Sequence, residues 1–234
     1  LAAGVLGPAV RAHWSSRYPR VDVPDLSEWA PEAAADVLRA HWNLTDGPLA
    51  NVVWEMEAHG IETFWTSDAS PSLSAYCRWI GDRPVVVLND RSGDGCRSRF
   101  DAAHELGHLV LHRGEDFDER DPREREREAD AFASAFLLPR SSFGEDAPDH
   151  FDPDDLLEMK SVWKTSVQAM VRRMRDLRLL SEWQYESAFV KMSAWGWRSE
   201  AEPRCGTTES SYVHSRLCEK LMADDRDPKS FSRD

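Results

Sequence analysis

Five consecutive residues near the middle of the chain have the types and spacing of a metal site: His104-Glu105-Leu106-Gly107-His108. On a helix, residues four apart lie on the same face, so both imidazole rings can bind one ion. Glu105 then projects beside them, where its carboxylate can take a proton from a water on the metal. A zinc ion would lower the pKa of that water toward ~7 and favour hydrolysis of a polarised carbonyl group. The pattern predicts His104 and His108 as zinc ligands and Glu105 as general base.

The residues around this motif favour a helix from about Arg99 to His112. Phe100, Ala103 and Leu106 recur at helical spacing and give this helix an apolar side that can pack in a core. We therefore expect the two histidines to be presented by a buried helix.

A catalytic zinc ion takes three protein ligands and keeps one position open. The downstream residues with suitable donor atoms are His112, Glu126, Glu128 and Asp130. His112 follows His104 by eight residues, which is about 12 Å along one helix. No glycine between His108 and His112 would break that helix, so we do not expect His112 to bind the same ion.

A second helix, expected from about Glu124 to Leu138, offers two carboxylates on one face. Glu126 and Asp130 are one turn apart, so Glu126 can bind zinc while Asp130 accepts the other ring N–H of a histidine ligand and fixes its tautomer. Glu128 lies about 200° around the helix from Glu126 and is expected to face solvent. The same charged run also fits a solvated helix start. Its position after the histidine motif and before the apolar run 132–138 favours the metal site.

The elements expected around these two helices predict an α+β fold that is mainly helical, with a small, largely antiparallel sheet and a C-terminal helical lobe. Further helices are expected over about 31–42, 49–59, 154–163, 166–177 and 182–195, and strands over 61–66, 76–80 and 84–89. Residues 141–152 are expected to be a loop. The predicted organisation is a lead-in segment (1–28), a metallopeptidase core (29–143), a helical lobe (144–198) and a polar tail (199–234). The tail includes a possible short helix with Val213, Leu217 and Leu221.

The helical lobe contains a set of large apolar residues at helical spacing. They are Trp163, Met170, Val171, Met174 and Leu177. Such a stripe is more typical of a core than of a ligand pocket.

Composition and charge exclude several classes of function. The chain has 42 acidic against 29 basic residues and a formal net charge of −13, so a direct nucleic-acid partner is not expected. No apolar run approaches the ~20 residues of a membrane helix. The opening segment does not have the pattern of a signal peptide. We expect no membrane partner and a cytoplasmic location.

The four cysteines are scattered and form no CxxC pair: Cys77, Cys96, Cys205 and Cys218. This spacing favours reduced thiols over a disulfide framework or a cysteine-rich zinc site. Cys96, eight residues before His104, is a candidate redox-sensitive group, but its position favours simple packing of a free thiol.

Two segments, RFDAAHELGHLVLH (99–112) and EREADAFASAFLLP (126–139), resemble the ImmA/IrrE family of zinc metallopeptidases. Segments 41–64, 85–90 and 163–180 are also similar, so the resemblance spans roughly Ala33 to Trp197. It implies a zincin-like, thermolysin-like site with Zn²⁺ as cofactor, Glu126 as third ligand and Asp130 as the residue that orients a histidine. It also implies a protein substrate, an Xre-type helix-turn-helix repressor, whose cleavage derepresses phage, mobile-element or stress-response genes. Many relatives have Asn where this chain has Asp130, and either side chain can accept a histidine N–H.

Two parts of such a mechanism can be assigned only as hypotheses. Residues 85–89 would be an edge strand that binds the substrate backbone by β-augmentation, the alternative being an ordinary core strand. Four residues are candidates for the group that stabilises the oxyanion: Tyr76, Tyr185, His112 and His150.

Two functions compete for this pattern. The first is a zinc endopeptidase, and the second is a non-cleaving, metal-containing module that senses a partner protein or ligand. A module without turnover needs no general base, so the presence of Glu105 favours the endopeptidase. A purely structural zinc site fits poorly, because such sites are closed by four ligands, usually including cysteine.

Overall fold

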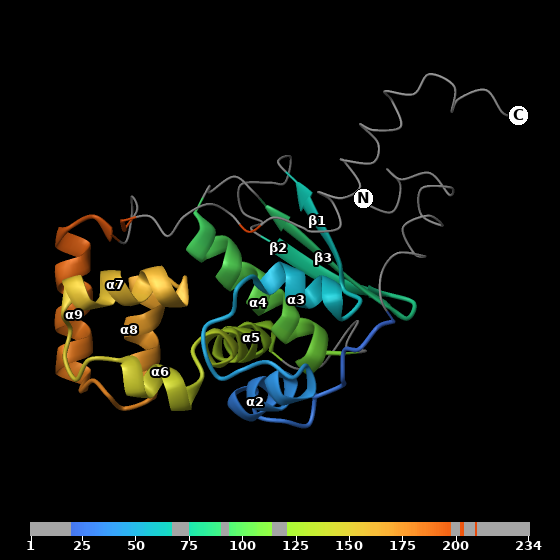
Figure 1. Ribbon diagram of the computed structural model, residues 1–234, viewed down its shortest axis with the longest axis horizontal. Helices are drawn as coiled ribbons and strands as arrows, with labels where there is room; N and C mark the ends of the chain where they lie inside the picture. Colours follow the sequence, from blue (N-terminus) through green and yellow to red (C-terminus); the bar gives the residue numbers. More distant parts are fainter. Residues whose placement is uncertain are drawn as a thin grey trace, which may run out of the picture.

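The computed structural model describes residues 20–66, 75–89, 94–113, 121–197, 202–203 and 209. Within these ranges the chain is mainly helical, with a three-stranded sheet at one end (Figure 1), which confirms the predicted α+β class. The helices are α2 (Pro31–His41), α3 (Val52–Ala58), α4 (Gly95–Leu111), α5 (Pro122–Leu137), α6 (Arg140–Asp146), α7 (Pro153–Trp163), α8 (Val167–Asp176) and α9 (Glu182–Ala194). The strands are β1 (Glu62–Thr66), β2 (Ala75–Ile80) and β3 (Arg83–Asn89).

The sheet has the order β1-β3-β2, with β2 antiparallel and β1 parallel to β3. The expectation of an antiparallel sheet therefore holds for one of the two pairs, and the sheet is mixed. The hypothesis that residues 85–89 form an edge strand is wrong, because β3 is central. Its run from Val85 to Leu88 is buried without alternation, as expected for a strand covered on both faces.

Helix α4 lies between the sheet and α5 (Figure 1) and is in contact with β2, β3 and α5. It begins at Gly95, earlier than expected, because the Asp94 side chain accepts hydrogen bonds from the amides of Cys96 and Arg97. On the β2 side, the Trp79 indole donates to the Leu109 carbonyl oxygen at 3.2 Å. The histidine motif is thus fixed between two layers of the core.

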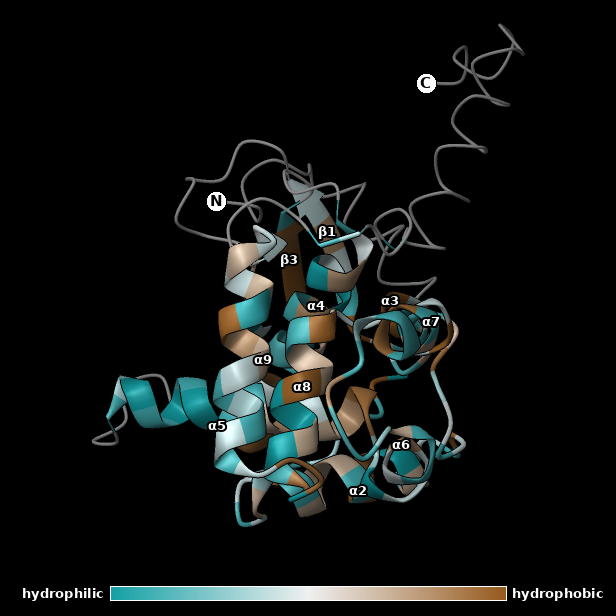
Figure 2. Ribbon diagram, turned by 90° about the vertical axis from the view of Figure 1, so that its left-hand side faces the viewer, coloured by the Kyte–Doolittle hydropathy of each residue, from teal (hydrophilic) through white to brown (hydrophobic). Residues whose placement is uncertain are grey.

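Helix α5 starts in solvent and ends in the core. Its polar first half projects from the body of the molecule (Figure 2), capped by Asp121, whereas Phe132 and Phe136 in its second half are fully buried. Pro139 ends α5 but also precedes a new helix, α6, so the predicted loop over 141–152 is wrong for its first part. The buried Phe143 explains why this segment folds against the core.

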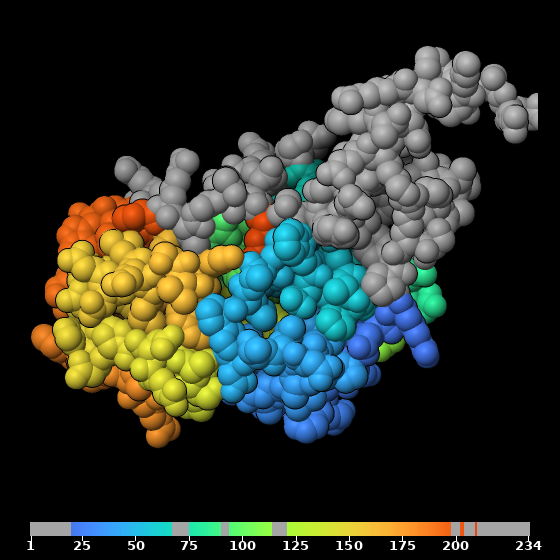
Figure 3. All heavy atoms as spheres, in the orientation of Figure 1, coloured from blue at the N-terminus to red at the C-terminus, as the bar shows by residue number. Residues whose placement is uncertain are grey.

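The C-terminal helices gather at one end of the molecule, next to the N-terminal helices (Figure 3). Arg173 on α8 is buried and donates to both carboxylate oxygens of Glu32 on α2, at 2.6 and 2.8 Å, and to the Leu138 carbonyl oxygen at 2.8 Å. Lys164 donates to the Ala50 carbonyl oxygen at 2.9 Å. These contacts join the lobe to the core.

The predicted apolar stripe of the lobe is in the core. Trp163, Met170, Val171 and Met174 are fully buried, and Leu177 is partly buried against the core, which confirms their assignment as core residues. Residues 20–28 also pack on the core, because the amide of Leu26 donates to the Val110 carbonyl oxygen. The predicted domain boundaries stay predictions, and the short helix predicted in the tail lies outside the described residues.

The expectation of reduced thiols holds for Cys77 but not for Cys96. Cys77 on β2 is free, but Cys96 at the start of α4 is disulfide-bonded and 1% exposed. The expectation that Cys96 is a free thiol, either packed in the core or redox-sensitive, is therefore wrong. In the described ranges, none of the helices has the length and apolar character needed to cross a membrane.

Candidate active site

Three predicted ligand atoms converge between α4 and α5. His104 Nε2 lies 3.1 Å from His108 Nε2 and 3.3 Å from Glu126 Oε2, and His108 Nε2 lies 3.5 Å from Glu126 Oε1. The two histidines are one turn apart on α4, and Glu126 reaches them from the projecting start of α5, where its side chain is 63% exposed. Two imidazole nitrogens and one carboxylate thus face a common point.

These distances fit a single small ion. Ligand atoms on a tetrahedral ion with bonds of ~2.0–2.1 Å lie ~3.3 Å apart, close to the three measured separations. The donor set of two imidazoles and one carboxylate is also one that zinc uses in catalytic sites. Among the described residues, His104, His108 and Glu126 form the group that can hold a metal ion.

The other ring nitrogen of His104 is hydrogen-bonded to a carboxylate. Its Nδ1 lies 2.9 Å from Asp130 Oδ1, so Asp130 holds the ring with Nε2 toward the common point. Burial alone would lower the pKa of His104, but the hydrogen bond and the charge of Asp130, together with the carboxylates of Glu105 and Glu126, outweigh it and leave this pKa above its ordinary value. The predicted positions of Glu126 and Asp130 on one face of α5 are thus the observed ones.

The Nδ1 atom of His108, unlike that of His104, faces another histidine. His108 Nδ1 lies 2.9 Å from His112 Nδ1, and His112 Nε2 lies 2.9 Å from Glu128 Oε2. Burial and the neighbouring rings of His104 and His112 lower the pKa of His108 to about 3, so its ring is neutral at pH 7. The expectation that Glu128 faces solvent is wrong.

Helix geometry explains both positions. Ala129 faces α4, where its backbone lies 3.3 Å from an ideal Cβ placed on Gly107. At 100° per residue, Glu126 lies on one flank of this contact line and Glu128 on the other. One crossing of α4 and α5 therefore brings two carboxylates of α5 to two histidines of α4.

The candidate base, Glu105, is buried against β2 and is 6% exposed. Burial raises its pKa, opposed by a hydrogen bond from the thiol of Cys77. Burial and the nearby Glu105 carboxylate raise the pKa of Cys77 well above its ordinary value, so the thiol is protonated and can donate. Strand alternation gives the only sequence signal for this contact, because Cys77 shares the face of β2 that carries Trp79, and Trp79 donates to α4.

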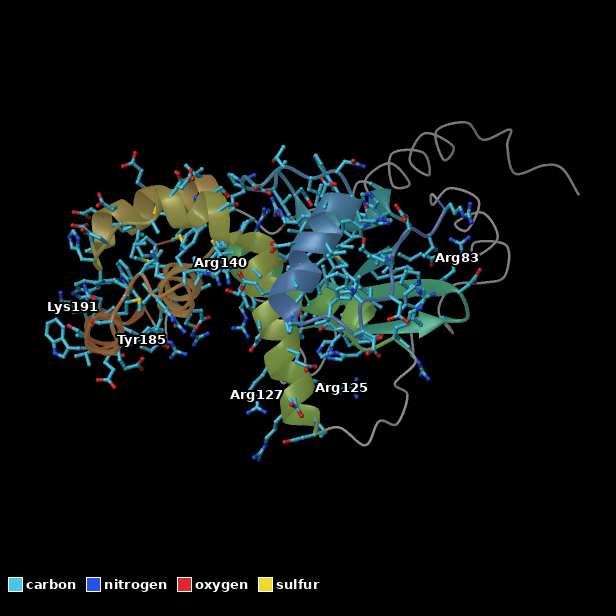
Figure 4. All side chains as sticks on the ribbon, turned by 90° about the horizontal axis from the view of Figure 1, so that it is seen from below. Arg83, Arg125, Arg127, Arg140, Tyr185 and Lys191 are labelled. Carbon is cyan, nitrogen blue, oxygen red and sulfur yellow. The ribbon has the colours of Figure 1, made fainter. Side chains whose placement is uncertain are left out.

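The four oxyanion candidates are placed as follows. Tyr76 is on the exposed face of β2, opposite to Cys77. Tyr185 belongs to the helical lobe (Figure 4), where its ring lies 4.7 Å from that of Phe189, and His150 pairs with Asp149 in an exposed loop. His112 is turned toward Glu128. None of these contacts directs a candidate to the common point of His104 and Glu126.

Sequence reasoning overlooked a cation next to the site, Arg125. It precedes Glu126 at the start of α5 (Figure 4) and is half-buried. Its charge contributes to the lowered pKa of His108, after burial and the two histidine rings. The arginine-rich start of α5 was the only signal for it, and that run does not distinguish Arg125 from its neighbours.

A cavity of about 320 Å³ opens beside Asp130, between α5 and the helical lobe. Its lining residues are Phe100, Arg127, Asp130, Ala131, Ser134, Ala169, Arg172, Arg175 and Asp176. Asp130 thus contacts His104 and also lines this cavity.

Comparisons with known proteins agree with the resemblance found in the sequence. The profile of the Peptidase_M78 family, described as an IrrE N-terminal-like domain, matches residues 56–175, which include both histidine and glutamate motifs. No curated protein matches the chain. A solved Mycobacterium tuberculosis transcriptional regulator aligns with 16% sequence identity and a TM-score of 0.45, over 62% of this chain and 46% of that one, so the aligned part is about half of that protein. The family match shows that the chain belongs to the Peptidase_M78 family and contains a metallopeptidase-like, IrrE N-terminal-like domain.

Proposed function

We propose that this protein is a zinc-dependent endopeptidase that hydrolyses a peptide bond in a protein substrate. The observation that carries this proposal is the convergence of His104 Nε2, His108 Nε2 and the Glu126 carboxylate beside a buried glutamate, Glu105. Three ligands leave one position open for a reacting group, as catalytic sites require.

Each polar residue of the site has a role in this proposal. His104, His108 and Glu126 would hold Zn²⁺, which when bound supplies Lewis acidity that acidifies water and polarises a carbonyl group. Glu105 takes the proton of the attacking water and returns it to the leaving amine. Its burial raises its pKa, which makes it a stronger base than an exposed carboxylate.

The negative charge that develops on the carbonyl oxygen needs a nearby cation or hydrogen-bond donor. We assign this role to Arg125, because it is half-buried and its charge acts on His108. Tyr185 and His150 are engaged elsewhere, as described above, which favours Arg125 over them.

For the substrate backbone, the position of β3 in the centre of the sheet moves the proposed binding edge to β2. One edge of β2 pairs with β3, and the side chain of Cys77, on one face of β2, contacts Glu105. An extended peptide added to the outer edge of β2 would run alongside the site. This placement brings a scissile bond near the general base.

The proposed substrate is an Xre-type helix-turn-helix repressor, whose cleavage would derepress phage, mobile-element or stress-response genes. This part rests on the family to which the chain belongs. The alternative is a metal-containing regulatory module that binds a partner without cutting it.

The test combines zinc analysis with a cleavage assay on the helix-turn-helix protein encoded beside this gene. We expect one zinc per chain, cleavage that a chelator abolishes and zinc restores, and loss of cleavage in Glu105→Gln with zinc retained. Glu124→Gln, an exposed glutamate at the start of α5, is the matched control and should cleave as wild type does. Full cleavage by Glu105→Gln would refute the general-base role, and tight repressor binding without any cleavage would favour the regulatory module.

A further inference from the structure

A chain of three polar side chains leads from the candidate ligand His108 into the protein. His108 Nδ1 is 2.9 Å from His112 Nδ1, and His112 Nε2 is 2.9 Å from Glu128 Oε2. The side chain of His112 is 1% exposed and that of Glu128 is 30% exposed. Water therefore competes little for the contact between the two rings.

The positions of the hydrogens in this series of hydrogen bonds follow from the ring of His108, which would bind the metal. His108 points Nε2 at His104 and Glu126, so a ligand His108 carries its hydrogen on Nδ1 and donates it to His112 Nδ1. His112 then carries its own hydrogen on Nε2 and donates it to Glu128. Each donor meets one acceptor, and the two bonds select one tautomer for each ring.

We propose that His112 and Glu128 are positioning residues for His108, as Asp130 is for His104. The pair would hold the His108 ring with Nε2 toward the metal position and keep it in the tautomer that can bind. This inference rests on the proposed function, because it assumes that His108 binds zinc.

The architecture favours this role over that of a core histidine satisfied by a chance partner. His112 ends α4, immediately after Leu111, and its amide still donates to the His108 carbonyl oxygen at 3.1 Å. The same two residues are thus linked through backbone and side chain. Glu128 comes from α5, which also supplies Glu126, so a shift of α5 would act on both histidine ligands at once.

Zinc affinity of the full chain, measured by competition with a chromophoric chelator, tests the proposal. We expect Glu128→Ala and His112→Phe each to weaken zinc binding about 10- to 100-fold, the usual effect of losing such a support. Glu128→Gln keeps an oxygen that accepts from His112 Nε2 and should stay within about threefold of wild type. Glu124→Ala, on the exposed first turn of α5, is the matched control and should not change the affinity.

A second readout does not depend on zinc. In the zinc-free protein, ¹⁵N NMR of the histidine rings reports which nitrogen of His108 carries the hydrogen. We expect a predominant Nδ1–H form in wild type and in Glu128→Gln, and a mixture of tautomers in Glu128→Ala and His112→Phe. A merely structural role would lower the melting temperature of these variants without changing the His108 tautomer.

The outcomes separate this inference from the proposed function. If wild type binds no zinc, the proposed function fails whatever the NMR shows, and this inference fails with it. If wild type binds zinc tightly and Glu128→Ala keeps both the affinity and the His108 tautomer, the inference alone is overturned. If His112→Phe does not fold, the Glu128 pair of variants still decides between these results.

Discussion

Helices α4 and α5 approach each other closely at Gly107, and a methyl group there tests whether this crossing sets the metal site. A Cβ on Gly107 would lie 3.0 Å from Phe132 Cδ1 and 3.3 Å from both the Cα and the carbonyl oxygen of Ala129. Carbon atoms in good contact are ~3.5–4.0 Å apart. Gly107→Ala therefore requires α5 to move by roughly 0.3–0.5 Å or Phe132 to leave its position.

Two opposing effects set the change in stability. Overpacking of a core costs about 1–3 kcal/mol, whereas Ala in place of Gly inside a helix gains about 1 kcal/mol. We expect Gly107→Ala to lower the free energy of unfolding by roughly 0–2 kcal/mol, so the protein still folds. The effect on zinc should be larger, because metal–ligand distances tolerate only about 0.2 Å. Because the shift of α5 would displace Glu126 by more than this tolerance, we expect zinc affinity to fall about tenfold or more.

The assay pairs urea denaturation of the zinc-free protein with chelator competition for zinc. Gly144→Ala on α6 is the matched control, because its new Cβ would meet no atom within 4 Å. It should stabilise the protein by about 0.5–1 kcal/mol and leave zinc affinity unchanged. If Gly107→Ala is as stabilising as the control and binds zinc as tightly as wild type, the crossing does not set the site and the reasoning fails.

Further predictions concern the joint between lobe and core and the support of the base. Arg173→Ala should lower the free energy of unfolding by about 1–3 kcal/mol in urea denaturation, since it leaves the buried Leu138 carbonyl oxygen unpaired; an unchanged midpoint would contradict this. The hydrogen bond from Arg173 holds the pKa of Glu32 below its ordinary value of 4.5, so Glu32 adds stability above that pH and loses it as the pH falls through the lowered pKa. Unfolding free energies measured between about pH 5 and pH 3 should therefore fall less in Glu32→Gln than in wild type, and parallel curves would refute the linkage. Cys77→Ala removes the thiol that donates to Glu105, so kcat should fall, but by less than the ~10²-fold loss expected without a general base, with zinc content unchanged; an unaltered kcat would show that the thiol does not position Glu105.

Local patterns in the sequence were sufficient for much of the fold and for the spacing of the site. Periodicity located the two site helices, and the interval of four residues between His104 and His108 placed both rings on one face. The same interval on α5 placed Glu126 and Asp130 together. Each of these inferences involves residues of one helix, where backbone geometry alone determines which side chains are neighbours.

The errors arose where the neighbour belongs to another element. Glu126 and Glu128 do lie on opposite flanks of α5, but this does not expose Glu128 to solvent. A helix that crosses another presents two flanks to it rather than one face. Glu128 is therefore bound to His112 instead of facing solvent. The apolar run of β3 predicts a strand, yet its central position depends on pairing with β1, from which β2 separates it in the sequence, and composition does not encode that pairing.

The contact of Cys77 with Glu105 also joins two different elements, β2 and α4. It shows why the residues that support an active site are harder to predict than its metal ligands. Zinc restricts its ligands to a few residue types at few spacings, so the ligands are visible in the sequence. A residue that supports a ligand or base needs only one donor or acceptor at the right place, which a thiol, an imidazole or a carboxylate can each provide. At Glu105 the partner is a cysteine, at His104 an aspartate and at His108 a second histidine. Three different residue types thus perform one kind of task, and only the packing of β2, α4 and α5 determines which of them reaches which group.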